Sequence, residues 1–219
     1  METVTLTYHG KSYRINNPGE GRIGSKLNMG TAYELMLLED VYELGLTGSV
    51  FDVGAHIGNH TLFFGAVCGL KVYAWEPHDG SLEQLHDNLA LNPQLQVEVF
   101  DWAAGDRETR GRLSRGMWME FDPTREGAKL KLERGEIPVH RIDDRVDVPD
   151  LSVVKVDVEG MEPLVLAGLV RHIERSRPVI YCETHTDRAE EQTRAVLEPF
   201  GYRLNKVLRM GSPQHRWMP

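Results

Sequence analysis

Short apolar runs alternate with segments of helical period along most of the chain. The runs predict buried strands over 50–53, 72–75, 96–100, 151–156 and 178–182. Between them, apolar residues three and four positions apart predict helices over 59–68, 81–91, 162–173 and 187–197. The stretches 201–210 and 214–218 predict a closing pair of strands. Strands and helices in alternation are typical of an α/β fold with a parallel sheet and right-handed crossovers.

The first 48 residues follow a different pattern. Residues 3–15 alternate apolar and polar positions around His9-Gly10, which predicts a β-hairpin. Residues 16–30 are rich in Gly and Asn, and we interpret them as a loop. Thr31 and Glu34 have capping-box spacing, so a helix is expected to begin at Thr31 and to cover one edge of a cleft. We therefore expect an accessory region, 1–48, and a main domain, 49–219, in one compact unit.

Periodicity fades between Gly105 and Arg134. A short strand is possible over 111–114, and the arginines of this region are interpreted as a solvated surface. The apolar island 117–121 is either a loop tucked onto the core or, as a hypothesis, a lid that grips an apolar acceptor.

Composition and charge narrow the class of protein. The chain has 219 residues, 41% of them hydrophobic and 26% charged, as in an ordinary folded soluble domain. Its net charge of −8 argues against general affinity for nucleic acid or an acidic membrane. We expect no membrane span, no signal peptide and two buried free thiols, Cys68 and Cys182. A reducing cytoplasmic location is the default expectation.

The segment 49–61 is a strand, a glycine turn and a helix in immediate succession. Gly54 can take a positive φ, and Gly58 allows a close approach of backbone or ligand. Glu76 ends the next strand, eighteen positions after Gly58, where a carboxylate can accept both hydroxyls of a ribose. Because the turn lacks the third glycine of a pyrophosphate cradle, it favours a nucleoside cofactor without phosphate over NAD.

Acidic residues follow five of the predicted strands. In an open parallel sheet the carboxyl ends of the strands form the ligand-binding edge. The polar residues expected there are Asp52, Glu76, Asp101, Asp157, Glu159, Glu183 and His185. A protein without a ligand would have little reason to collect carboxylates at this edge.

Several sequence blocks occur in an order that resembles one family. They are DVGAHIGN at 52–59, WEP at 75–77, AAGD at 103–106, IDD at 142–144, KVDVEGME at 155–162 and ETH at 183–185. Over about 50–185 the chain resembles the FkbM family of S-adenosylmethionine-dependent methyltransferases. That family usually has Asn at the position of His56, a difference that leaves the fold untouched and concerns the acceptor side of the pocket.

The resemblance implies a Rossmann-like class I methyltransferase, with a seven-stranded, mostly parallel sheet, its last strand antiparallel, and helices on both faces. It implies S-adenosyl-L-methionine as the cofactor. Glu76 would bind the ribose hydroxyls, and Asp157 would lie near the methionine ammonium or the acceptor. Asp101, Trp102 and Ala103 would lie near the adenine. The remaining cofactor-site residues would be Asp52, Gly54, Ala55, Ile57, Gly58, Asn59 and Thr61.

The expected reaction is O-methylation of a hydroxyl on a small molecule, sugar or natural product. The base candidates are His185 first and His56 second, with His60, Asp157 and Glu159 behind them. N-methylation of an amine or peptide, a non-catalytic cofactor-binding partner subunit and a nicotinamide dehydrogenase are the alternatives.

Two further questions stay open at this stage. Asp157, Glu159, Glu183 and His185 could hold Mg²⁺, but we favour a hydrogen-bond and salt-bridge network there and predict no metal. The hairpin could cover the domain or join a second subunit, so a homodimer is possible.

Overall fold

The computed structural model describes residues 2–114, 129–132, 135–209 and 212–219. The apolar island 117–121, which was interpreted as a lid or a tucked loop, lies outside these residues.

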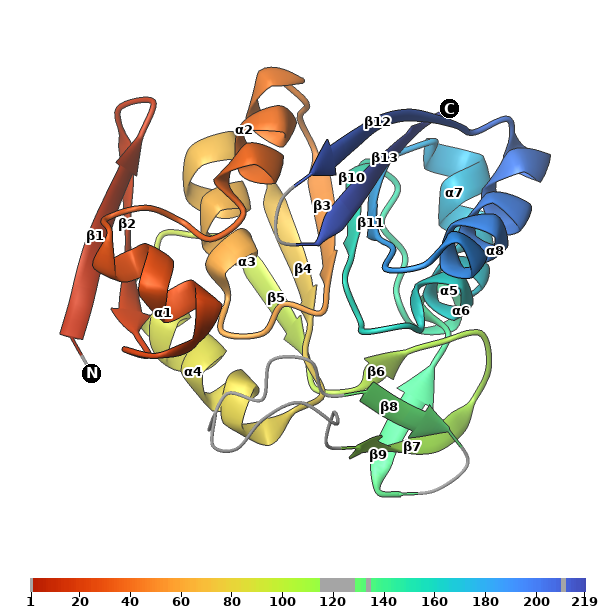
Figure 1. Ribbon diagram of the computed structural model, residues 1–219, viewed down its shortest axis with the longest axis horizontal. Helices are drawn as coiled ribbons and strands as arrows, with labels where there is room; N and C mark the ends of the chain where they lie inside the picture. Colours follow the sequence, from red (N-terminus) through yellow and green to blue (C-terminus); the bar gives the residue numbers. More distant parts are fainter. Residues whose placement is uncertain (1, 115–128, 133–134, 210–211) are drawn as a thin grey trace.

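A seven-stranded sheet forms the centre of the molecule (Figure 1). Its order is β12-β13-β11-β10-β3-β4-β5, and β13 runs antiparallel to both of its neighbours while the other pairs are parallel. The predicted mostly parallel sheet is thus confirmed. The strands are β3 Ser49–Val53, β4 Lys71–Trp75, β5 Val97–Phe100, β10 Leu151–Val156, β11 Val179–Glu183, β12 Arg203–Arg209 and β13 Pro213–Met218.

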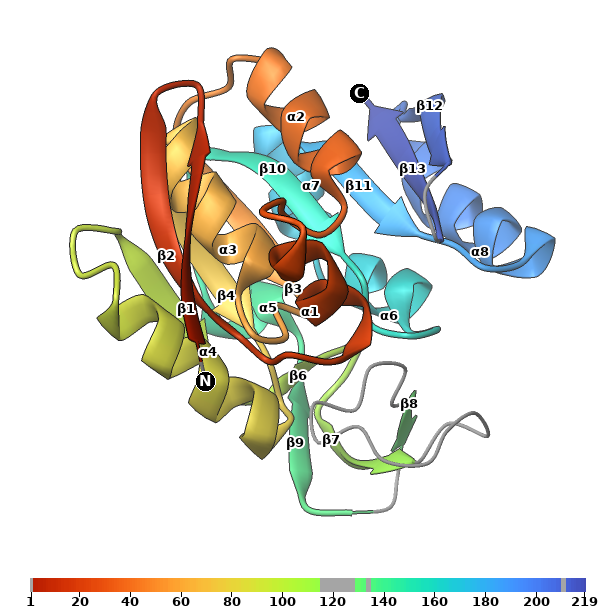
Figure 2. The same ribbon diagram turned by 60° about the vertical axis from the view of Figure 1, so that its left-hand side comes forward.

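Helices cover both faces of this sheet, as expected (Figures 1 and 2). One face carries α1 Gly21–Asn28, α2 Leu35–Glu43, α3 Asn59–Phe63, its π-helical continuation η1 Phe64–Cys68, and α4 Asp79–Ala90. The other carries α5 Ile142–Arg145, α6 Glu162–Ala167, α7 Val170–Ser176, α8 Asp187–Leu197 and the 3₁₀ turn η2 Glu198–Phe200. Each face buries its own apolar cluster, so the core has two layers around the sheet.

The N-terminal hairpin is confirmed as β1 Glu2–Tyr8 and β2 Lys11–Asn17, which pair antiparallel. His9 and Gly10 form its turn, with φ of 51° and 74°. Leu6, Tyr13 and Ile15 are buried in the same apolar cluster as α3 and α4, so the hairpin packs onto the main domain.

Two asparagines of α4 and the turn after it tie the hairpin down. Asn92 Oδ1 accepts from the backbone N–H of Arg14, and Asn88 Oδ1 accepts from that of Asn16. Asn88 Nδ2 also donates to the carbonyl of Ile57 in the glycine turn. One side chain therefore joins the hairpin to the turn.

The loop predicted over 16–30 is wrong, because residues 21–28 form α1. Ile23 and Leu27, four positions apart, bury on one face and stabilise this helix by tertiary packing. The start predicted at Thr31 is also wrong. Glu34 has a φ of 53° and blocks a helix before Leu35, and the Thr31 hydroxyl lies 3.3 Å from Tyr8 Oη.

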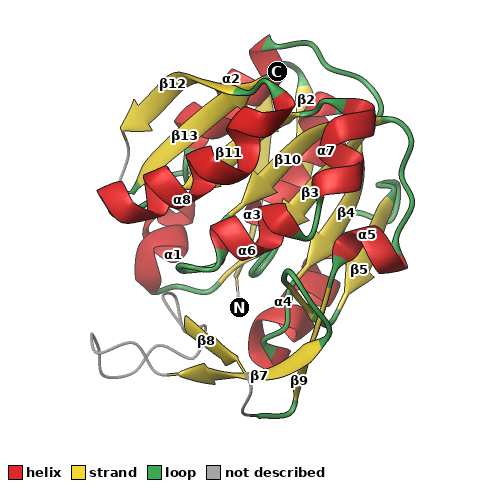
Figure 3. Cartoon of the chain, turned by 90° about the vertical axis from the view of Figure 1, so that its right-hand side faces the viewer, coloured by secondary structure: helices red, strands yellow, loops and turns green. Residues whose placement is uncertain are grey.

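A second, four-stranded sheet of order β6-β9-β7-β8 lies beside the main one (Figure 3). Its strands are β6 Ala103–Ala104, β7 Thr109–Ser114, β8 Lys129–Leu132 and β9 Ile137–His140. The sequence predicted only the short strand at 111–114. The helix predicted over 162–173 is two helices, because Leu169, with φ of −116° and ψ of 7°, departs from helical backbone angles.

The two cysteines are free, Cys182 buried and Cys68 partly buried. Within the ranges that the structure describes, no helix has the length and apolar character needed to cross a bilayer.

Candidate active site

A pocket opens at the carboxyl ends of β3, β4, β10 and β11. The small sheet closes it on one side, and α1 with the segment before α2 closes it on another. Its lining is Arg22, Ile23, Tyr33, Val53, Gly54, Ala55, His56, Asn59, His60, Trp75, Glu76, Pro77, His78, Ser81, Trp102, Ala103, Ala104, Leu113, Lys155, Asp157, Val158, Glu159, Met161 and Glu183. This is the ligand-binding edge that an open parallel sheet provides.

The glycine turn is fixed by its backbone. The N–H groups of Gly54 and Ala55 both donate to the carbonyl of Trp75, at 3.0 and 2.9 Å. Gly54 has a φ of 84°, and a Cβ there would lie 1.8 Å from the carbonyl oxygen of Asp157. Only glycine lets the ends of β3 and β10 approach this closely.

Glu76 is held by backbone donors at the end of β4. Its Oε2 accepts from the N–H of His56 at 2.9 Å, and its Oε1 accepts from the N–H of His78 at 2.8 Å. Burial raises the pKa of this carboxyl, against the nearby charge of His56. Each oxygen keeps a lone pair, so the side chain can accept two further hydrogen bonds from a ligand.

His56 has a left-handed backbone, with φ of 51°. Asn adopts this conformation more readily than most residues. This gives a physical reason for the Asn that the family described above usually has at this position. The N–H of His56 orients Glu76, and its side chain lines the pocket on the Glu76 side.

A buried lysine lies beneath the pocket. Lys155 Nζ donates to the Gly54 carbonyl at 2.7 Å and lies 3.1 Å from Asp52 Oδ1 and 3.9 Å from Asp157 Oδ2. Burial alone would lower the pKa of Lys155, but the charges of Asp52 and Asp157 outweigh it and raise that pKa. Asp52 also accepts from the Thr61 hydroxyl at 2.6 Å. These groups hold the turn from below.

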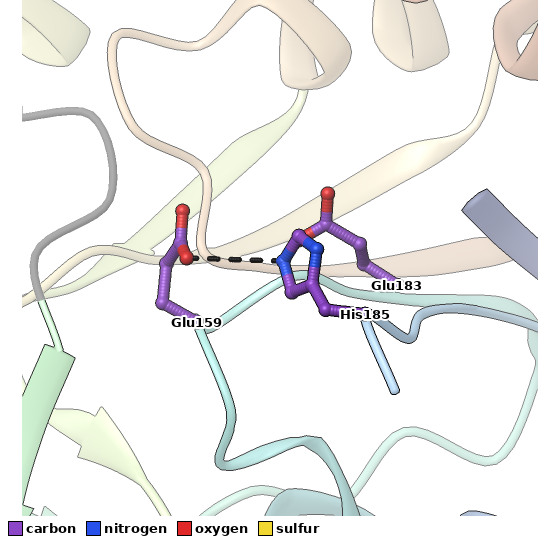
Figure 4. Close-up of side chains that lie close together, drawn as sticks. All are labelled: Glu159, Glu183 and His185. Atoms are coloured by element: carbon purple, nitrogen blue, oxygen red, sulfur yellow. Dashed lines mark ion pairs between the residues drawn. The ribbon is translucent and has the colours of Figure 1, made fainter. Parts of the chain in front are cut away.

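An acidic end lies opposite Glu76 and consists of Asp157, Glu159, Glu183 and His185. His185 Nε2 lies 2.9 Å from Glu183 Oε2 and 3.9 Å from Glu159 Oε2 (Figure 4). Burial and the neighbouring Asp157 charge raise the pKa of Glu183 to about 9. Glu159 has a φ of 58°, so its position depends on a left-handed backbone.

A histidine–carboxylate pair lies on a further wall. His60 Nε2 is 3.2 Å from Glu34 Oε2, and both side chains are buried. Asn59 clamps the adjacent backbone, since its side chain accepts from the N–H of Tyr33 and donates to its carbonyl, each at 3.0 Å. This clamp brings Tyr33, and with it the accessory region, to the pocket.

The residues predicted from the sequence divide into two groups. Those that line the pocket are Gly54, Ala55, His56, Asn59, Glu76, Trp102, Ala103, Asp157 and Glu159. Those that do not are Asp52, Ile57, Gly58, Thr61, Asp101 and His185. Asp52 and Thr61 are fully buried under the turn, and Asp101 is exposed outside the wall.

Sequence reasoning missed several lining residues. Lys155 could have been recognised, because a lysine inside an apolar central strand is buried and then needs a charged or hydrogen-bonding partner. Arg22, Ile23 and Tyr33 carried none, because the segment that presents them was interpreted as a loop and an uninterrupted helix.

Comparisons with known proteins agree with this geometry. The profile of the methyltransferase FkbM domain matches residues 52–206. The hexuronic acid methyltransferase AglP of Haloferax volcanii is 29% identical over 155 residues, which cover 66% of this chain. The aligned part spans 58% of that relative's length.

Solved structures share the fold. The FkbM methyltransferase of Methylobacillus flagellatus superposes with a TM-score of 0.57 at 22% identity, over 78% of this chain and 43% of that one. Fibrillarin of Aeropyrum pernix, solved with S-adenosylmethionine, superposes with a TM-score of 0.53 at 11% identity, over 98% and 81%. By its match over 52–206, the chain belongs to the FkbM family of S-adenosylmethionine-dependent methyltransferases.

Proposed function

We propose that this protein transfers the methyl group of S-adenosylmethionine to a hydroxyl of a sugar acid of the hexuronic class. The observation that carries the proposal is a single pocket with Glu76 at one end and the carboxylates Asp157 and Glu159 at the other. The name of the Haloferax volcanii relative supplies the acceptor class.

The lining fits S-adenosylmethionine group by group. Glu76 has two backbone-fixed oxygens with free lone pairs for the ribose hydroxyls. Trp102, Ala103 and Leu113 provide an apolar wall for the adenine. The acidic character of the end opposite Glu76 suits a ligand with a positively charged sulfonium, and the two-glycine turn offers no pyrophosphate cradle. When bound, the cofactor supplies a methyl group on a positively charged sulfur.

The acidic end is where we place the acceptor. Its hydroxyl oxygen forms the new O–C bond while the C–S bond breaks, and the electron pair stays on the sulfur of S-adenosylhomocysteine. The hydroxyl proton passes to a base, and we assign that role to Asp157, which lines the pocket. His185, the first candidate from the sequence, lies against Glu183 and outside the lining. His56 lies at the Glu76 end, away from the acceptor.

Methyl-labelled S-adenosylmethionine tests the proposal. Glucuronic and galacturonic acid, the matching neutral hexoses, an amine and a short peptide are offered in parallel. We expect label in the uronic acids, stable to mild base as an ether is; a base-labile ester would move the reaction to the acceptor carboxylate. Label only in the amine or peptide would overturn the proposal in favour of N-methylation.

Calorimetry separates the non-catalytic alternatives. We expect S-adenosylmethionine to bind and NAD not to. Cofactor binding with no transfer to any acceptor in the presence of cell extract would support a partner subunit without turnover.

A further inference from the structure

We propose that Glu159, Glu183 and His185 form a binding site for a divalent transition-metal ion at the acceptor end of the pocket. The two glutamates come from the ends of different strands, and His185 follows the second of them (Figure 4). One ligand atom from each residue can be chosen so that all three lie within 4.8 Å of one another.

The spacing of these atoms resembles that of ligands around one ion. With ligand distances of about 2.1 Å in octahedral geometry, neighbouring ligand atoms are about 3.0 Å apart and opposite ones about 4.2 Å. His185 Nε2 lies 2.9 Å from Glu183 Oε2 and 3.9 Å from Glu159 Oε2. Small side-chain adjustments would bring all three atoms into one coordination sphere.

Glu183 supplies an independent observation. It is only 5% exposed and lines the pocket, and while its carboxyl group hydrogen-bonds with Asp157 and Ser212, its Oε2 has no hydrogen-bond partner among the described residues. His185 Nε2 lies close to that oxygen without a directional hydrogen bond between them. A buried carboxylate oxygen without a donor is costly, and a cation would satisfy it.

Acidic side chains gather at this end of the pocket. Asp157, Glu159 and Glu183 lie there, and Lys155, 3.9 Å from Asp157, is shared with Asp52 and the Gly54 carbonyl beneath the turn. A sugar acid would bring one more carboxylate. An ion here could bind the acceptor's carboxylate and an adjacent hydroxyl, which lowers the pKa of that hydroxyl. This acceptor role rests on the proposed function, whereas ion binding itself does not.

The donor set indicates which ion to expect. Mg²⁺ and Ca²⁺ prefer oxygen ligands alone, whereas an imidazole with two carboxylates suits Mn²⁺, Fe²⁺ or Zn²⁺. The inference therefore differs from the sequence expectation, which favoured a salt-bridge network and considered only Mg²⁺.

Mn²⁺ binding tests the site. The full chain is first treated with a chelator, and the binding of added Mn²⁺ is then followed by electron paramagnetic resonance. We expect one strong site in the wild type and at least a 10-fold weaker affinity in Glu159→Gln and in His185→Ala. Both side chains are part-exposed, at 31% and 42%, so these variants should fold; circular dichroism checks this. His9→Ala is the matched control, because His9 pairs with Glu39 at 2.6 Å on the surface.

The outcomes separate this inference from the proposed function. S-adenosylmethionine affinity is measured with and without chelator, and we expect it to change little, while transfer to uronic acids falls in chelator and returns with Mn²⁺. No Mn²⁺ binding, or equal binding by the wild type and both site variants, would overturn the metal site. Full transfer activity in chelator would overturn its acceptor role and leave the methyltransferase assignment intact.

Discussion

Glu76 and Asp157 both follow sheet strands, yet different neighbours hold them. Glu76 receives two backbone N–H groups, so its orientation is set by the chain itself. Asp157 faces Lys155 Nζ, 3.9 Å away, and shares a hydrogen bond with Glu183. A carboxylate fixed by backbone donors suits the binding of neutral hydroxyls, and one within reach of a hydroxyl can accept its proton.

Replacing Glu76 tests the first of these roles. Glu76→Gln removes the charge and puts an amide where an acceptor is needed, so the Kd for S-adenosylmethionine should rise about 10- to 100-fold. Isothermal titration calorimetry measures it. Glu98→Gln, on the exposed side of β5, is the control and should bind like the wild type. Equal affinities for both variants would remove Glu76 from the ribose site.

Replacing Asp157 separates a base from a cofactor ligand. Asp157→Asn should lower kcat by about 100-fold or more, because the proton has lost its acceptor, while the Kd for the cofactor changes much less. Single-turnover transfer and calorimetry together give the two values. A large rise in Kd with little change in kcat would instead place Asp157 on the methionine ammonium.

The site was predictable from the sequence only where spacing carried the information. Glu76 follows its glycine turn at a distance that topology dictates, so it was found. Tyr33 reaches the pocket because Asn59 clamps its backbone, and no local pattern reports a contact between residues 26 positions apart. Asp52 was predicted to belong to the cofactor site, but it contacts Lys155 and Thr61 beneath the turn and does not line the pocket.

Among the elements, long apolar runs were predicted and short or irregular ones were missed. β10 and β11 are buried throughout most of their length, and their apolar residues show it. β6 has only two residues, too few for any period, and it exists because β9 pairs with it. α1 has a Gly- and Asn-rich sequence and depends on the burial of Ile23 and Leu27. Tertiary contacts decided these cases over local propensity.

The glycine turn gives a prediction at this scale. Gly54→Ala adds a Cβ that would lie 1.8 Å from the Asp157 carbonyl oxygen, in addition to the strain of its positive φ. Gly10→Ala has a similar φ, 74°, but meets nothing within 4 Å, so it isolates the strain. We expect Gly54→Ala to cost at least about 2 kcal/mol more than Gly10→Ala in urea unfolding. Equal costs would mean that β3 and β10 can separate freely.

At the scale of the whole molecule, the two faces of the sheet are held differently. One face carries the hairpin, α1 and α2, and the other carries the helices α5 to α8, where a buried histidine–aspartate hydrogen bond joins α7 to α5. There His172 Nδ1 lies 2.6 Å from Asp143 Oδ1, and Asp143 also accepts from the backbone N–H of Arg171.

This pair predicts how stability depends on pH. Burial would raise the pKa of Asp143, but hydrogen bonds from His172 and the Arg171 backbone outweigh it, so that pKa lies below its usual range. Because the folded-state pKa is the lower one, the stabilisation is complete above the unfolded value of about 3.9 and is lost as the pH falls through the folded value. Asp143→Asn should therefore lower the unfolding free energy by about 1–3 kcal/mol near neutral pH.

Urea unfolding over a pH series gives the unfolding free energies of the wild type and of Asp143→Asn. The gap between the wild type and Asp143→Asn should narrow in acid, below the ordinary range of an aspartate. Asp144→Asn, at a neighbouring carboxylate that is 49% exposed, is the control and should show a small, constant effect. A gap that stays constant with pH would mean that Asp143 acts through packing and not through its charge.

Asn88 has a consequence for how the protein is made. Its side chain accepts a hydrogen bond from the hairpin, 72 positions earlier, and donates one to the glycine turn, 31 positions earlier. The turn therefore gains this hydrogen bond only after α4 has been made. During synthesis the first strands leave the ribosome long before this asparagine does. We expect cofactor affinity to be acquired late on the emerging chain, and to be lost early when a protease clips the hairpin from the finished enzyme.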